Sequence, residues 1–302
     1  MMHHARTSEV LMKVSALLFA VGLAAAGGPR QDRASQPASA GGTEPERGEV
    51  LWRADYSDYP NAGFGAAETK SLDQRFTREF LPTGGPGGRP AHRLKMRYCE
   101  TCNDFGGQFN WGNRANLFDS DPPPGTRRYY RFRMRVSGNN RGRSWDDGAP
   151  SDITNKVLIV GQGCGRGCRF ILTYETADGG GIRNFRIQKD GGEDLDDTGS
   201  FPPDKWLSVQ VELLTGKPGA SDGGYRLWVN NGDYKRPDAK RDRIELHGAN
   251  HRYVWLGGFV NDGLMSDGTH VLDLADFEIG TAFDPDWHRV DEPKDRKSAT
   301  EG

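Results

Sequence analysis

Hydrophobic and polar positions alternate most clearly over residues 204–231. In the first half, every second residue is apolar, which is typical of a β-strand with one buried and one wet face. These apolar residues are Leu207, Val209, Val211 and Leu213. A loop rich in Gly, Pro, Ser and Asp follows over 216–224, and the alternation then returns through Tyr225, Leu227 and Val229. The stretch predicts two strands joined by a loop, ending at the turn dipeptide Asn231–Gly232.

Short strand patterns of this kind recur along much of the chain. Apolar and polar positions alternate over 93–98 and 129–136, and 156–160 is a continuous apolar run. Further candidates are 50–56, 77–81, 108–112, 169–174, 182–188, 253–260 and 270–279. No long amphipathic helical pattern with caps occurs. Many short strands with Gly/Pro-rich turns predict an all-β fold, a two-sheet antiparallel jelly-roll sandwich.

The two ends of the chain differ from this pattern. Lys13, the apolar run 14–23 and the small residues 24–26 have the three-part order of an export signal. The run is too short to span a membrane, which needs about 20 residues, so we predict no membrane span and a secreted or periplasmic protein. The alternative is a short buried helix. The predicted organisation is a signal peptide (1–26), a disordered linker (27–48), the jelly-roll domain (49–287) and a disordered charged tail (288–302).

Charge has to be considered locally, because the net charge is only -2. This value gives no reason to expect a nucleic-acid partner, and we predict a monomer. Locally, Arg131, Arg133 and Arg135 project from one face of the strand over 129–136. Three like charges in a row repel unless an anion or facing carboxylates neutralise them. An acidic polysaccharide is such an anion, whereas Asp and Glu from neighbouring strands are the alternative.

Four segments resemble a known group of proteins. They are RRYYRFRMRVS (127–137), KWLSVQVELL (205–214), DGGYRLWVNN (222–231) and VLDLADFEIG (271–280). In this order they resemble secreted concanavalin A-like jelly-roll proteins, particularly the polysaccharide-lyase-like members related to heparin and alginate lyases. The resemblance implies that the concave sheet forms a groove for glycans. The Gln-Ile/Val-His triplet and the Tyr-Phe-Lys strand of alginate lyases do not occur, so no active-site residue is transferred.

Lyase chemistry on a uronate needs a group that neutralises the carboxylate, a base for the C5 proton and an acid for the leaving oxygen. The predicted catalytic residues are Tyr129, Arg131, Arg133, His251 and Tyr253. His251 and Tyr253 share a face if both lie in a strand, although a surface role is the alternative for any single histidine. The predicted glycan-binding residues are Arg135, Arg169, Arg186, Arg226 and Trp228. Trp228 lies on the polar face of its strand, and packing is its alternative role.

The cysteines form two close pairs, Cys99–Cys102 and Cys164–Cys168. In an exported chain we predict disulfides within each pair, with a structural zinc site joining the pairs as the alternative. We predict no catalytic metal and no cofactor. The acidic run 193–197 leaves structural calcium open, with an acidic surface loop as the favoured interpretation.

Two further function classes remain beside the lyase prediction. The first is a non-catalytic glycan-binding module of the same fold. The second, which is weaker, is a glycoside hydrolase, because Asp276 and Glu278 share a face if their strand is regular and retaining hydrolysis needs two carboxyls about 5 Å apart. The sequence therefore predicts an exported protein that cleaves or binds acidic polysaccharide.

Overall fold

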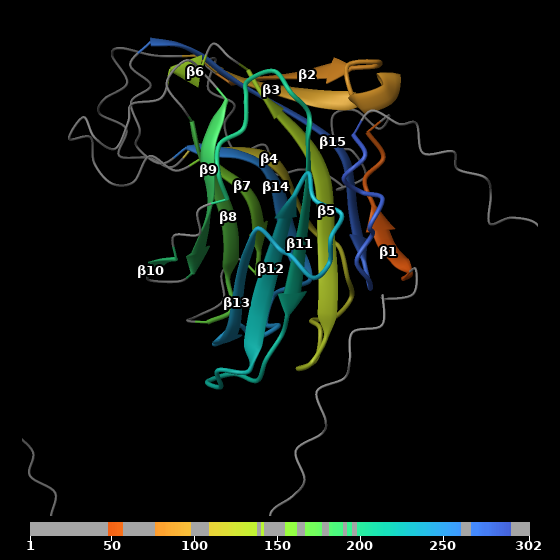
Figure 1. Cartoon of the computed structure of the whole chain (residues 1–302), viewed down its shortest axis with the longest axis vertical. Coiled ribbons are helices and arrows are strands. Elements are labelled where there is room, and N and C mark those ends of the chain that lie inside the picture. Colours follow the sequence, from red (N-terminus) through yellow and green to blue (C-terminus); the bar gives the residue numbers. More distant parts are fainter. Residues whose placement is uncertain are drawn as a thin grey trace, which may run out of the picture. The chain divides into compact units, whose positions relative to one another are not determined.

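The described part of the chain consists of two antiparallel sheets (Figure 1). The computed structural model describes residues 48–56, 76–97, 109–137, 140–141, 155–161, 167–176, 181–189, 192–194, 198–260 and 267–290. All of these residues belong to one unit, Thr43–Gly302. They contain a short 3-10 turn, Pro86–Gly88, and no helix among them is long and apolar enough to cross a membrane. The predicted all-β jelly roll is confirmed.

The first sheet has nine strands. Its main order is β13 (Ala239–Ile244), β12 (Gly223–Val229), β11 (Leu207–Leu214), β5 (Arg127–Val136), β15 (Asp267–Gly280), β3 (Ala91–Arg97) and β2 (Phe76–Leu81). β1 (Val50–Arg53) and β6 (Asn140–Arg141) also pair with β15. The edge strand β13 carries exposed charged side chains, which discourage pairing with another chain.

The second sheet has six strands. Their order is β10 (Gly192–Asp194), β9 (Ile182–Lys189), β8 (Phe170–Thr176), β7 (Asn155–Val160), β14 (Tyr253–Val260) and β4 (Phe109–Asn116). The predicted hairpin over 169–188 is the β8–β9 pair. The pair predicted over 204–231 is β11–β12, which lies in the other sheet.

Alternation within the strands builds the core between the sheets. From β5, Tyr130, Phe132 and Met134 enter the core, and Phe170 and Leu172 enter it from β8. The four apolar residues of β11 named above enter it as well. Residues of opposite parity therefore lie on the outer faces of the two sheets, where any functional surface has to be sought.

A break in β15 and the segment after it shape the outer face of the nine-stranded sheet. The register with β5 shifts between Ala275 and Glu278, and Asp276 has a φ of 54°. The chain then runs through residues 281–290, here called the C-terminal strap. Within it, Trp287 is buried, and its Nε1 donates to the Val209 carbonyl at 3.1 Å. The strap therefore lies against β5 and β11, and its last three residues belong to the predicted tail.

Candidate functional site

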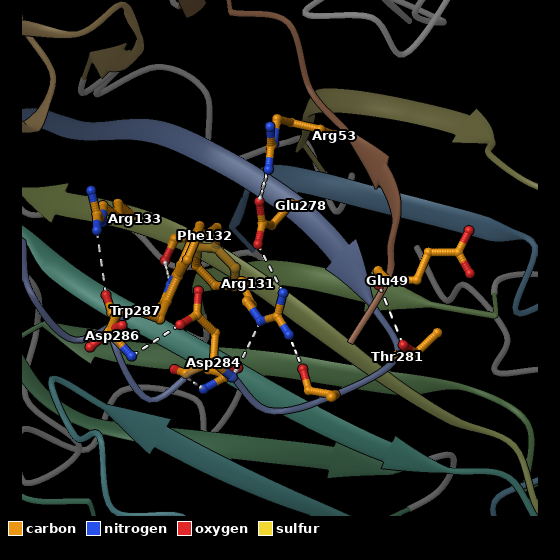
Figure 2. A network of polar contacts seen from close by, with 12 residues as sticks. Glu49, Arg53, Arg131, Phe132, Arg133, Glu278, Thr281, Asp284, Asp286 and Trp287 are labelled. Atoms are coloured by element: carbon orange, nitrogen blue, oxygen red, sulfur yellow. Dashed lines mark hydrogen bonds and ion pairs between the residues drawn. The ribbon is translucent and has the colours of Figure 1, made fainter. Parts of the chain in front are cut away.

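Arg131, the centre of the predicted glycan-binding strand, is buried and saturated with partners. Its side chain donates to Gln210 Oε1 at 2.7 Å, to Glu278 Oε1 at 2.8 Å and to the carbonyl of Ala282 in the strap (Figure 2). Only 4% of the residue is exposed. All three nitrogens of this guanidinium group thus donate hydrogen bonds to other parts of the protein.

Arg133 is held in the same way, one step further along β5. It is fully buried, and its Nη1 lies 3.1 Å from Asp276 Oδ2. Its Nη2 donates to the carbonyls of Arg289 at 2.9 Å and Trp287 at 3.5 Å. The strap therefore covers Arg131 and Arg133, the two arginines predicted to be catalytic.

A common arrangement covers this outer face, which we call the arginine face. Each of four carboxylates, three buried and one half-buried (Asp276), binds two arginines. The groups are Glu278 with Arg53 and Arg131, Asp276 with Arg89 and Arg133, Asp273 with Arg93 and Arg135, and Glu212 with Arg127 and Arg226. This is the alternative in which acidic residues of neighbouring strands balance the arginines. The binding roles assigned to Arg131, Arg133, Arg135 and Arg226 stay predictions.

Tyr129 and Trp228 also serve the packing of this face. The Tyr129 hydroxyl donates to Glu212 Oε2 at 2.6 Å, and burial together with Glu212 raises its pKa far above the usual range. Trp228 is buried and lies against Tyr234, with ring centroids 5.9 Å apart, and Phe283. Stacking of a sugar on Trp228 is therefore blocked by protein, which corresponds to the packing alternative.

His251 and Tyr253 do not share a face, because β14 begins only at Tyr253. His251 lies in the preceding turn, is 1% exposed, and its Nε2 lies 2.7 Å from the Cys168 carbonyl. Burial lowers the pKa of His251 to about 4, and nearby Arg128 and His247 act in the same direction. His251 is thus a neutral, enclosed histidine. Tyr253 is half-buried and has the opposite parity to Val254, which lies in the core.

The outer face of the six-stranded sheet has a different character. Here the register places Lys156, Thr173 and Arg186 side by side on β7, β8 and β9. The next row contains Trp255, Ile159, Ile171 and Gln188, and a further pair is Glu175 with Asn184. We call this set, together with Tyr253, the six-stranded face. It combines two cations, amides and apolar surface.

Two amide oxygens on the six-stranded face lack partners in the described part of the chain. Asn184 Oδ1 and Gln188 Oε1 are buried without a hydrogen bond to the described residues. An unsatisfied buried polar atom costs about 1–3 kcal/mol, and an explanation is required for each. Between them, Arg186 Nη2 lies 2.6 Å from Glu175 Oε1. A ligand with hydroxyl groups would satisfy both amides.

The structure therefore divides the predicted site residues between two faces. Arg186 lies on the six-stranded face with Tyr253, and half-buried Arg169 directly precedes β8 on the side opposite the core residue Phe170. Arg131, Arg133, Arg135 and Arg226 lie on the other sheet. Lys156, Asn184 and Gln188 were missed, although the alternation of 184, 186 and 188 in β9 is visible in the sequence.

Other predicted sites are settled only in part. Cys168 is disulfide-bonded, whereas Cys99, Cys102 and Cys164 lie outside the described residues, so the pairing stays a prediction. Most of the acidic run 193–197 lies there too. Among the residues that the structure describes, no group of three or more His, Cys, Asp and Glu could hold a metal. Asp276 and Glu278, the predicted hydrolase pair, each bind a different pair of arginines across the register break.

Comparison with known proteins gives similarity at the level of the fold. The chain matches no protein-family model and no curated protein sequence. Among solved structures, the endo-β-1,4-glucuronan lyase of the fungus Trichoderma reesei matches with a TM-score of 0.57 and 13% identity, over 79% of this chain and 99% of that one. The marine PL-14 alginate lyase of Aplysia kurodai matches with a TM-score of 0.49 and 12% identity, over 77% and 99%. The match to the glucuronan lyase shows that the chain has the concanavalin A-like jelly-roll fold.

Proposed function

We propose that the protein binds acidic polysaccharide on the six-stranded face and cleaves it by β-elimination at a uronate. The observation that carries this proposal is the pair of unsatisfied amide oxygens, Asn184 Oδ1 and Gln188 Oε1, on either side of Arg186. Sugar hydroxyls donate to such oxygens, and a uronate carboxylate accepts from guanidinium and ammonium groups. The fold shared with a glucuronan lyase supports the same substrate class.

Residues of this face can neutralise the uronate carboxylate and orient the sugar ring. Arg186 and Lys156 neutralise the uronate carboxylate, which stabilises the negative charge that develops when the C5 proton leaves. A base takes the C5 proton and an acid protonates the leaving oxygen. Tyr253 is too distant to do this at the same uronate, because it lies beside Gly161, whereas Lys156 pairs with Phe259 at the far end of β14. The electron pair of the C5–H bond forms the C4–C5 double bond, and the C4–O bond breaks. Asn184 and Gln188 orient the ring through its hydroxyls.

A non-catalytic glycan-binding module is the second candidate function. Glu175 favours it, because this buried carboxylate pairs with Arg186 and thereby weakens the positive field that elimination requires. Both candidates fit an exported protein. We therefore also propose that residues 1–26 direct the chain to a secreted or periplasmic location and are removed.

The test is an absorbance assay at 230–235 nm, which detects unsaturated uronate ends, with glucuronan, alginate, pectate and heparin as substrates. We expect Arg186→Gln and Lys156→Gln each to lower kcat/KM at least tenfold, because each removes a charge that neutralises the carboxylate.

Arg183→Gln is the matched control, because Arg183 is exposed on the same strand and has no role in the proposal. Binding by calorimetry without absorbance on any substrate would favour the non-catalytic module. Release of reducing ends without absorbance would favour hydrolysis. If the folded protein neither bound nor cleaved any of these substrates, the proposed function would be excluded.

A further inference from the structure

Trp206 is a tryptophan that the packing of the described residues does not explain. It directly precedes β11 on the arginine face, is only partly buried, and belongs to none of the apolar clusters. Trp228 and Trp255 belong to such clusters, Trp52 packs against one, and Trp287 is buried. The described ring contact of Trp206 is with Arg135, whose guanidinium carbon lies 4.8 Å from the ring centroid. The indole is thus placed at the surface beside a cation.

Arg135 and Trp206 belong to a row of side chains that begins at Arg93 and crosses neighbouring strands of the sheet. In register, Arg93 of β3, Asp273 of β15 and Arg135 of β5 lie side by side. Arg93 binds both carboxylate oxygens of Asp273, with Nε at 2.7 Å and Nη2 at 3.0 Å. Arg135 binds Oδ2 through Nε at 2.8 Å and Nη2 at 2.6 Å. From Arg93 to Trp206 the row is about 14 Å long, three inter-strand spacings.

The two guanidinium groups of this row reach the surface. Opposite Arg93 on β2 the row continues with Glu79, which pairs with Lys95, and the negative charge of Asp204 also acts on Arg93. Asp273 is buried, with 2% of its side chain exposed, whereas 29% of the Arg93 side chain and 24% of the Arg135 side chain are exposed. Their Nη1 atoms are not among the buried polar atoms without partners, and the hydrogen bonds of both guanidinium groups use Nε and Nη2. Both Nη1 groups therefore face solvent, oriented by the buried carboxylate.

We propose that Trp206, Arg135 and Arg93 form a second binding site for acidic polysaccharide. A pyranose ring stacks on the indole of Trp206, and the uronate carboxylates accept hydrogen bonds from Nη1 of Arg135 and Arg93. Asp273 holds the two guanidinium groups in place before the glycan arrives, which reduces the entropy lost on binding. The C-terminal strap covers Arg131 and Arg133, so this end of the arginine face is where its cations reach solvent beside an aromatic ring.

The site goes beyond the proposed function, since it lies on the opposite sheet and needs no chemistry. A polymer held there and on the six-stranded face would bind through two sites, which raises its apparent affinity. Neither site requires the other. The two proposals can therefore fail separately.

The test measures calorimetric binding of alginate oligosaccharides in the background Lys156→Gln/Arg186→Gln, which weakens the six-stranded face. We expect the remaining binding to fall about tenfold with Trp206→Ala and about tenfold with Arg93→Gln, since each removes one good contact. Trp206→Phe should keep most of the affinity, because it keeps an aromatic surface. Arg236→Gln, a change at an exposed arginine that lies outside the row, should leave binding unchanged.

Thermal unfolding shows which variants are folded. Should Trp206→Ala not fold, Arg93→Gln and Trp206→Phe still decide the question. Unchanged binding in folded Trp206→Ala and Arg93→Gln would overturn the site. Equal losses for a neutral glucan or a DNA oligonucleotide would overturn its assignment to acidic sugars. If the background substitutions have no effect while Trp206→Ala weakens binding, the second site stands and the proposed function fails.

Discussion

Two buried ionisable side chains, Arg131 and His251, avoid the cost of burial in different ways. Arg131 is matched by the carboxylate of Glu278 and by oxygens of Gln210 and Ala282. Among the described residues, the ring of His251 is matched by the Cys168 carbonyl alone, and burial keeps it neutral. A buried neutral histidine must take up a proton at low pH or unfold first. The sequence could not reveal this difference, because burial depends on contacts with distant segments.

His251 should therefore make the fold sensitive to acid. Its pKa is about 4 in the folded state, against the ordinary histidine value of 6.5 in an unfolded chain. Between these values the unfolded state binds more protons, so stability falls as pH falls. The contribution is complete above pH about 6.5 and is lost by pH about 4, a change of about 3 kcal/mol. Urea unfolding across this range measures it.

The control is His251→Gln, which keeps a side chain able to donate to the Cys168 carbonyl and has no proton to gain. Its free energy of unfolding should vary less with pH over the same window. Identical pH profiles for both proteins would show that His251 is already protonated or is not the group responsible.

At the scale of the elements, the strands were predictable and their partners were not. The alternation of β5 predicted that Tyr130, Phe132, Met134 and Val136 share a face, and all four lie in the core. Alternation predicts which residues lie on each face of a strand, but it does not predict which segment covers the outer face. Arg131 and Arg186 were therefore both predicted to contact the glycan, although they lie on opposite sheets. The strap over Arg131 has no periodic pattern, so nothing in its sequence marked it as a cover.

The strap should stabilise the nine-stranded sheet mainly through Trp287. Its indole is buried and donates to Val209 O, and its own carbonyl accepts from Arg133. We expect Trp287→Ala to lower the free energy of unfolding by about 3–5 kcal/mol, the usual cost of emptying such a site. Denaturant unfolding provides the measurement. Arg289→Ala, at an exposed side chain of the same segment, should change the free energy of unfolding by less than about 0.5 kcal/mol. If Trp287→Ala had an equally small effect, the strap would be loosely held.

At the scale of the described domain, the two outer faces differ in which polar groups lack partners: Arg133 Nε, a donor, on the arginine face, and amide oxygens, which are acceptors, on the six-stranded face. The arginine face pairs each buried carboxylate with two arginines, whereas the six-stranded face leaves amide oxygens unsatisfied. Natural proteins carry such locally unfavourable groups at functional sites. Two glutamines on opposite faces, Gln188 and Gln210, offer a direct comparison, because both are at least half-buried strand residues.

Replacement of each glutamine by leucine should have opposite effects on stability. Gln210 Oε1 accepts from Arg131 Nε at 2.7 Å and from the Asp284 amide at 2.9 Å, so Gln210→Leu leaves two donors unpaired and should cost at least about 2 kcal/mol. Gln188 Oε1 has no such donor, so Gln188→Leu should stabilise the free protein by about 1 kcal/mol. Gln188→Leu should at the same time weaken glycan binding about tenfold, since the leucine cannot accept from a sugar hydroxyl. Urea unfolding and calorimetry on the same preparations measure both quantities.

If Gln188→Leu destabilised the protein as much as Gln210→Leu and left glycan affinity unchanged, the six-stranded face would be structural and the division between the two faces would be wrong.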